Sequence, residues 1–67
     1  MNHIFLTDKS TAHHGSLMVN ADSLTLVRQV HSNFGDEYAE IYIGNDKIDV
    51  VEKYDEVITI MKEAGVL

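Results

Sequence analysis

The stretch from Ile41 to Met61 constrains this chain most, because its hydrophobic period changes halfway along. Before Lys53 the apolar residues alternate with polar ones, which is the period of a half-buried strand. After Lys53 they recur at intervals of three and four, which is the period of an amphipathic helix. A β-hairpin therefore runs almost directly into a helix, and the two can supply two sides of one small core.

The helix is predicted over residues 53–64. Acidic Asp55 and Glu56 lie in its first turn, where the helix dipole favours negative charge, and Gly65 is placed to end it. A helix this short is not stable alone, so its apolar stripe must be buried against the strands. That stripe consists of Tyr54, Val57, Ile58, Met61 and Ala64.

Two registers are possible for the hairpin that precedes this helix. A two-residue loop at 44–45 would set Glu40 directly opposite Asp49, and like charges in that position destabilise a sheet. A loop at 45–46 sets Tyr42 opposite Asp49 instead, and its Asn and Asp residues tolerate the positive φ that such a turn requires. We therefore predict the loop at 45–46.

The fold class predicted is α+β, in a single domain of residues 1–67. We expect a small antiparallel β-meander or half-barrel of about five strands, with one C-terminal helix packed on it. The Asn-Ala-Asp-Ser segment at 20–23 has turn chemistry, because such side chains bond to the local backbone. The strands are predicted at residues 3–7, 17–19, 24–31, 38–43 and 47–51.

Size and composition exclude several classes of protein. The chain has 67 residues and no cysteine, which excludes disulfides and thiolate zinc sites and suits a reducing cytoplasm. No apolar run approaches the roughly 20 residues of a membrane helix, and the start MNHIFLTDKS does not read as a signal peptide. We expect a cytoplasmic protein without membrane insertion.

The net charge of −6 is concentrated in the C-terminal half. Of the 11 acids, only Asp8 and Asp22 precede residue 36, whereas Lys47, Lys53 and Lys62 are the basic residues after it. Such a surface repels nucleic acid and anionic lipid, so no nucleic-acid partner is expected. Two interpretations stay open: an acidic surface that keeps a small protein soluble, and a docking face for a basic patch on another protein.

No recognisable catalytic or metal-binding motif is present. His13 and His14 are adjacent in a loop beside Gly15, and with His3 and His31 they show none of the spacings typical of metal ligands. No glycine-rich phosphate loop or nucleophile elbow occurs either. We therefore expect a protein without a metal, a cofactor or an enzymatic activity. His13 and His14 remain candidate binding residues as exposed loop histidines.

Aromatic and acidic residues of the fourth predicted strand form a candidate binding surface. Tyr38, Glu40 and Tyr42 share the outward face of this strand, and Phe34 precedes them in a loop. Exposed tyrosines beside acids can anchor a protein partner, since Tyr is enriched at interface hot spots. The alternative is that these tyrosines only stabilise the sheet through cross-strand pairs.

Arg28 is the one charged residue in the run LTLVRQV. It shares its parity with Leu24 and Leu26, so it would point inward unless a bulge changes the phase of the strand. An inward arginine needs a carboxylate such as Glu40, or it lines a ligand-binding surface. Arg28 is therefore also a candidate binding residue.

Several of these features together resemble the FlbD/SwrD-like family of small bacterial proteins, loosely over residues 17–64. Asn20, Asp22 and Leu24 fit the family's turn between its second and third strands. The entry to the last helix also fits, although Lys53 stands where the family has a serine that caps this helix. The residues that match this second signature are Val50, Glu52, Asp55, Glu56 and Val57.

The resemblance implies a non-enzymatic accessory protein, linked in that family to flagellar motility. Together with the free strand edges of so short a meander, it favours a small acidic regulatory module that acts by protein–protein contact as a homodimer or higher homo-oligomer. The alternative is a phage- or mobile-element-encoded anti-defence protein that binds a host protein or sequesters a small nucleotide.

Overall fold

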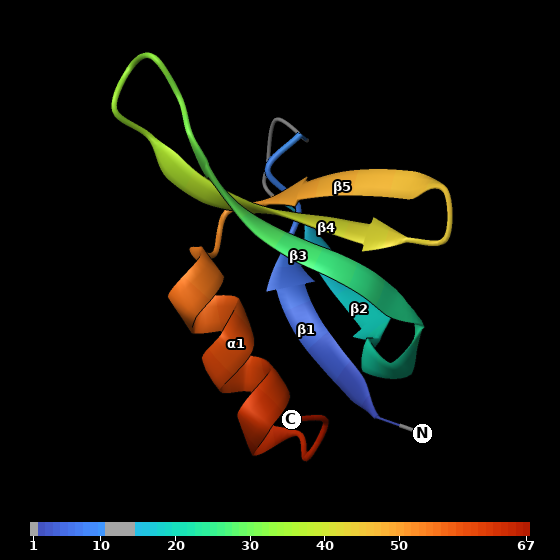
Figure 1. Ribbon diagram of the computed structural model, residues 1–67. Helices are drawn as coiled ribbons and strands as arrows, with labels where there is room; N and C mark the ends of the chain where they lie inside the picture. The colour runs from blue at the N-terminus through green and yellow to red at the C-terminus, as the bar shows by residue number, and fades with distance from the viewer. Residues whose placement is uncertain (1, 11–14) are drawn as a thin grey trace.

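A computed structural model describes residues 2–10 and 15–67 of the chain. Five antiparallel strands and one C-terminal helix confirm the predicted α+β class, with every strand where it was expected to within about two residues (Figure 1). The elements are β1 (His3–Thr7), β2 (Ser16–Asn20), the 3-10 turn η1 (Ala21–Ser23), β3 (Leu24–His31), β4 (Glu37–Ile43), β5 (Asp46–Val50) and α1 (Tyr54–Glu63).

The strands form two sheets that do not close into a barrel. One holds β1 and β2, and the other holds β3, β4 and β5 in that order. The end of β1 and the residues after it join the two sheets: the Val51 N–H donates to the Thr7 carbonyl at 2.8 Å, and the Lys9 N–H donates to the Asp49 carbonyl at 2.9 Å. In the first sheet β1 lies between α1 and β2 (Figure 1).

One core unites both sheets and the helix, as the change of period predicted. Val57 and Met61 of α1 are buried, and Ile58 packs against the same cluster, whereas Tyr54 at the start of the stripe stays 39% exposed. The buried hydrophobic residues are Ile4, Leu6, Val19, Ala21, Ala39, Ile41, Val50, Val57 and Met61.

The predicted register of the β4–β5 hairpin is wrong. The loop consists of Gly44 and Asn45, with Gly44 at φ +60°, so Glu40 lies directly opposite Asp49. The prediction weighed this acidic pair in isolation. In the folded chain, Arg28 and Lys47 both pair with Glu40 and offset the repulsion.

A β-bulge near the start of β3 changes which residues face the core. The register with β4 shifts between Leu24 and Leu26. As a result Leu24 and Val27 both pack against the core, while Leu26 is 46% exposed. Arg28 therefore points outward, and the inward orientation expected from unbroken alternation is wrong.

The ends of α1 are satisfied by partners from different parts of the chain. At the N-terminal end, the Gln29 side-chain oxygen on β3 accepts from the Tyr54 N–H at 2.8 Å, which supplies an acceptor from outside the helix where Lys53 offers none. At the C-terminal end, Gly65 adopts φ +80° and ends the helix as predicted.

Over residues 2–10 and 15–67, no helix is long and apolar enough to cross a bilayer.

Candidate functional site

The outer face of the three-stranded sheet brings together four of the predicted binding residues. Arg28 lies opposite Glu40, and Tyr42 lies opposite Lys47 of β5, which sequence reasoning did not single out. Tyr38 lies further along β4. We call Arg28, Glu40, Tyr42 and Lys47 the Glu40 cluster.

Glu40 sits at the centre of this cluster and is 7% exposed, although it faces away from the core. Its Oε1 accepts from Arg28 Nε at 3.1 Å, and its Oε2 accepts from Lys47 Nζ at 3.4 Å. The ion pair between Arg28 and Glu40 that was considered from the sequence is thus present. The cations cover the carboxylate, which explains how a charged residue can be this buried.

The same contacts shift the pKa values of the cluster. The hydrogen bond from Arg28 holds the pKa of the Glu40 carboxyl below its usual 4.5 and outweighs the opposing effect of burial. The hydrogen bonds to Glu40 raise the pKa values of Arg28 and Lys47. All three groups are therefore charged at neutral pH.

The Glu40→Gln variant should be less stable than the wild type at neutral pH, by an amount that shrinks in acid. A carboxyl with a lowered pKa in the folded state stabilises the fold above its unfolded value, near 4.5, and loses that contribution as the pH falls through its folded value. Melting temperatures measured between pH 7 and pH 2.5 should therefore converge. Glu63→Gln, on the exposed side of α1, is the control. If the melting temperature of Glu40→Gln stayed below that of the wild type by the same amount across this range, the lowered pKa of Glu40 would be contradicted.

The two tyrosines of the face already have cationic neighbours within the chain. The Lys9 ammonium lies 4.9 Å from the centroid of the Tyr38 ring, and the Arg28 guanidinium lies 5.9 Å from that of Tyr42. Both tyrosines are half-buried, and the Tyr42 hydroxyl accepts from Arg28 at 3.2 Å. These contacts fit a stabilising role in the sheet, the alternative that the sequence left open.

Phe34 lies apart from the Glu40 cluster, at the tip of the β3–β4 hairpin, and is 93% exposed. Its turn is held by several hydrogen bonds. The Ser32 Oγ accepts from the N–H groups of Phe34 at 3.2 Å and of Asp36 at 3.1 Å, and Gly35 adopts φ +87°. This hairpin projects past the rest of the molecule (Figure 1). A large aromatic ring is thus presented to solvent on a bonded turn.

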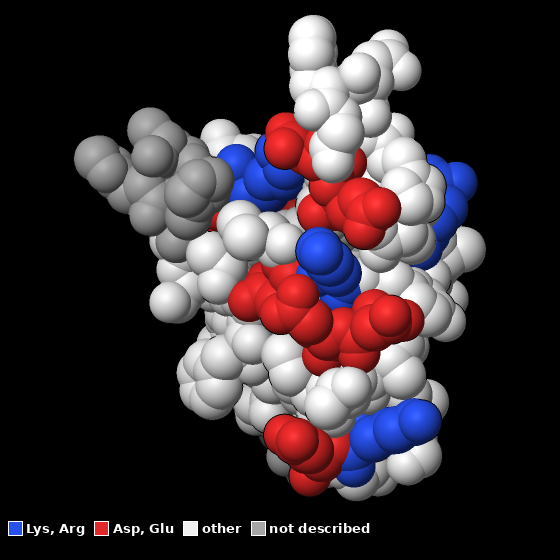
Figure 2. Space-filling view, turned by 90° about the vertical axis from the view of Figure 1, so that its left-hand side faces the viewer, with Lys and Arg blue, Asp and Glu red and all other residues white. Residues whose placement is uncertain are grey.

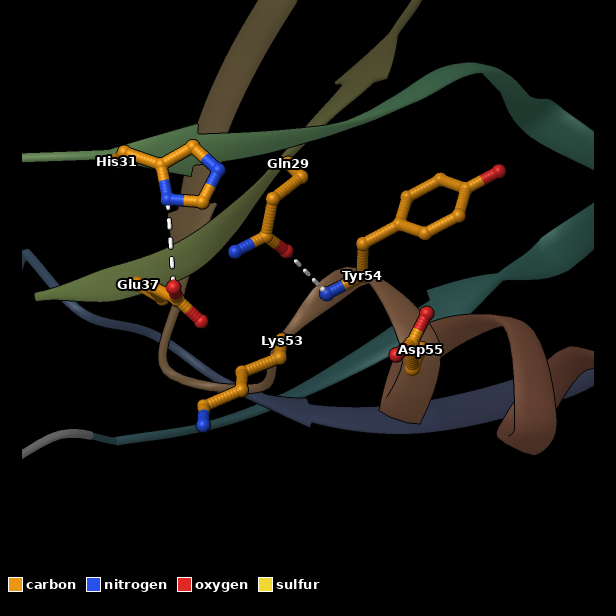
Figure 3. A pocket seen from close by; sticks show the side chains of 6 residues that line it. All are labelled: Gln29, His31, Glu37, Lys53, Tyr54 and Asp55. Atoms are coloured by element: carbon orange, nitrogen blue, oxygen red, sulfur yellow. Dashed lines mark hydrogen bonds and ion pairs between the residues drawn. The ribbon is translucent and has the colours of Figure 1, made fainter.

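A second feature, which sequence reasoning missed, is a hollow of about 240 Å³ where β3 and β4 meet the start of α1. Its lining residues come from segments far apart in the sequence, and His31 Nδ1 lies 3.4 Å from Glu37 Oε1 (Figure 3). The shift of phase at the bulge puts Gln29 and His31 on this side, and no sequence motif marks it. The residues around the hollow are Gln29, His31, Glu37, Lys53, Tyr54 and Asp55.

The acidic excess has a clear location. Acidic side chains gather around a basic one on the side of the molecule where α1 lies (Figure 2). Within residues 2–10 and 15–67, no three His, Asp or Glu side chains are grouped so that they could hold a metal ion. His13 and His14 lie outside the described residues.

Comparisons with known proteins find no matching family model, no matching curated protein and no matching solved structure.

Proposed function

We propose that this chain is a small, non-enzymatic regulatory module of the cytoplasm that acts by contact with another protein and associates with copies of itself, most simply as a dimer. The resemblance to FlbD/SwrD-like proteins implies the same kind of role. The acidic side of the molecule would favour a partner that presents basic residues there.

The observation that carries this proposal is the presentation of Phe34. An aromatic side chain that is 93% exposed contributes nothing to the core, and burying it fully would release apolar area of the order of 150 Å² from water. Its turn is already held by hydrogen bonds to the Ser32 hydroxyl, so little conformational entropy would be lost when a partner pocket closes over the ring. A projecting, preorganised aromatic group is the typical form of an interface anchor.

A photo-crosslinking amino acid placed at position 34 tests this role in cells that express the protein. We expect position 34 to give one dominant adduct, identified by mass spectrometry either as another protein or as a second copy of this chain. The matched control is position 45, where Asn45 is exposed in the other turn of the same sheet. Equal and diffuse labelling from the two positions would refute a role for Phe34 as an anchor.

A second candidate function is the sequestration of a small nucleotide by an anti-defence protein of a phage or mobile element. The observation that favours it is the meeting of two tyrosines and the cations Arg28, Lys47 and Lys9 on one sheet face. Because Glu40 already neutralises part of this charge, an anion must compete with it. Thermal stabilisation by members of a nucleotide panel, lost in Arg28→Ala, would favour this function over the first.

A further inference from the structure

The outer edge of β2 is open. The Asp8 N–H donates to the Gly15 carbonyl, and the Ala21 N–H donates to the Asn2 carbonyl, each at 2.8 Å. These bonds lie at the two ends of the β1–β2 ladder and share its register. Since bonded and non-bonded pairs alternate in an antiparallel ladder, the residues of β2 that bond to β1 are Leu17 and Val19.

The N–H and C=O groups of Ser16, Met18 and Asn20 therefore point away from β1. Within residues 2–10 and 15–67, no backbone group of another segment bonds to these outward groups; the Asn20 carbonyl begins η1 and keeps a second lone pair for a further donor. None of the five residues of β2 is charged or a proline, so the edge lacks the usual devices that keep strand edges apart.

The other three strand edges are less suited to self-pairing. The β3 edge is bulged near Leu24 and carries Arg28 at its middle, so antiparallel pairing with itself would bring two arginines close together. At the β5 edge, the Asp49 carbonyl already accepts from Lys9. The β1 edge is bonded at Thr7, whose carbonyl accepts from Val51 and whose N–H donates to Glu52. Of the four edges, only β2 is neutral, regular and without a bond from another described segment.

We infer that β2 pairs antiparallel with β2 of a second copy of this chain, around a two-fold axis at Met18. In this register Met18 lies opposite Met18 of the second copy, and Ser16 lies opposite its Asn20. All of these residues point their backbone groups outward, so each pair can exchange both of its hydrogen bonds. Leu17 then lies opposite Val19 of the second copy, and both keep their orientation toward the core. This inference rests on the proposed self-association and names its surface.

The side chains of the outer face are complementary in the same register. Phe5 and Met18 are directly opposed within one chain and are 66% and 65% exposed. Pairing at β2 would align them in a continuous apolar row of Phe5, Met18 and their two counterparts. On a monomer, the apolar surface of this pair stays exposed to water. In the dimer, the side chains of the row across four strands cover part of one another's apolar surface.

Electrostatics favour this contact over others. Each copy carries a net charge of −6, so two copies repel each other unless they meet where charge is sparse. The acidic side lies around α1 (Figure 2), and β1 separates α1 from β2 (Figure 1). An approach through β2 therefore keeps the two acidic sides apart.

The contact is small, which sets its expected strength. The exposed parts of Phe5 and Met18 together amount to about 250 Å², well below the roughly 800 Å² per partner of a standard stable interface. We therefore expect a weak, reversible dimer with a dissociation constant in the micromolar range, below about 500 μM.

Charged substitutions at the two-fold axis test the inference. The dissociation constant of the whole chain is measured by sedimentation equilibrium between about 5 and 500 μM. Met18→Lys and Met18→Glu should each weaken dimerisation at least tenfold, because each places like charges directly opposite one another. An equal mixture of the two variants should restore the dimer, since lysine then faces glutamate. Leu26→Lys and Leu26→Glu, on the exposed face of β3, are the matched controls and should dimerise like the wild type.

The outcomes separate this inference from the proposed function. A wild-type dimer that survives Met18→Lys would overturn pairing through β2 and leave self-association standing. Variants that are monomeric alone but fail to dimerise when mixed would overturn the register at Met18. A wild type that stays monomeric up to 500 μM would overturn both self-association and its surface, while the crosslinking test of Phe34 would still decide the contact with another protein. Circular dichroism checks that each variant folds; where one does not, the other variant alone decides, since it should be folded and monomeric.

Discussion

Replacing Ile41 with alanine should destabilise the fold by about 2–5 kcal/mol, the range measured for such truncations in well-packed cores. Ile41 is fully buried at the middle of the central strand β4, between Val27 of β3 and Ile48 of β5. Its removal leaves a cavity that three hydrogen-bonded strands cannot collapse to fill. A chain of this length has a total stability of only about 3–10 kcal/mol, so the variant should be partly unfolded at room temperature.

Urea denaturation followed by circular dichroism measures this effect as a lower midpoint with an unchanged slope. The protein concentration must be the same for all variants, because self-association would make the apparent stability depend on it. Leu26→Ala is the control: this residue is 46% exposed, and we expect its loss to cost far less. Equal effects at the two positions would mean that Ile41 is not at the centre of the core.

Replacing Glu52 with alanine should destabilise the fold by about 1.5–3 kcal/mol, the range for hydrogen bonds to a charged group. The Glu52 carboxylate accepts from the Thr7 N–H at 2.8 Å and from the Thr7 hydroxyl at 2.9 Å. These bonds tie the end of β1 to the segment between β5 and α1. Their loss leaves the half-buried N–H of Thr7 without its acceptor.

The effect of Glu52→Ala is measured as a melting temperature lowered by about 6–24 °C, at 4–8 °C per kcal/mol for a domain of this size. Glu52→Gln keeps one side-chain acceptor and should lose less. Exposed Glu63 on α1 provides the comparison for the loss of a charge alone, in Glu63→Ala. If Glu52→Ala and Glu63→Ala had the same melting temperature, the hydrogen bonds between Glu52 and Thr7 would contribute nothing to stability.

The order and type of the elements were predictable because local patterns determine them. The helix at 54–63 follows from its apolar period, and its end follows from Gly65, which adopts φ +80°. The bounds of β1 and β3 agree with the prediction in full. These features depend on residues close together in sequence, and such signals do not require knowledge of the tertiary structure.

The errors arose in the β4–β5 hairpin and in β3, because β3 supplies a cation that changes the electrostatics of the hairpin. The repulsion between Glu40 and Asp49 argued against the observed hairpin when only two strands were considered. Arg28, 12 residues before Glu40, is brought across the sheet by the bulge and offsets that repulsion. The sequence analysis allowed for a bulge in β3 and for a pairing of Arg28 with Glu40, but no local pattern fixes either one, so the register and the direction of Arg28 were predicted wrongly.

In the candidate site, too, residue types were predictable from the sequence, whereas features that depend on strand pairing were not. Arg28, Tyr38, Glu40 and Tyr42 were singled out for their residue types, and the structure does place them on one face. That face proves to be largely satisfied by its own contacts. The exposed Phe34 also came from the sequence, whereas the neutral edge of β2 emerged only once the pairing of β1 with β2 was known.

The acceptor that Gln29 gives to the first turn of α1 has a consequence for how the chain folds. The Tyr54 N–H at the start of this helix donates to a side chain on a strand 25 residues earlier, at 2.8 Å, whereas the local bond from the Lys53 N–H to Glu56 is longer, at 3.4 Å. The first turn of α1 therefore gains this bond only when β3 is already in place. Unfolding of β3 should consequently unfold α1 as well, so that the described elements unfold in a single cooperative transition.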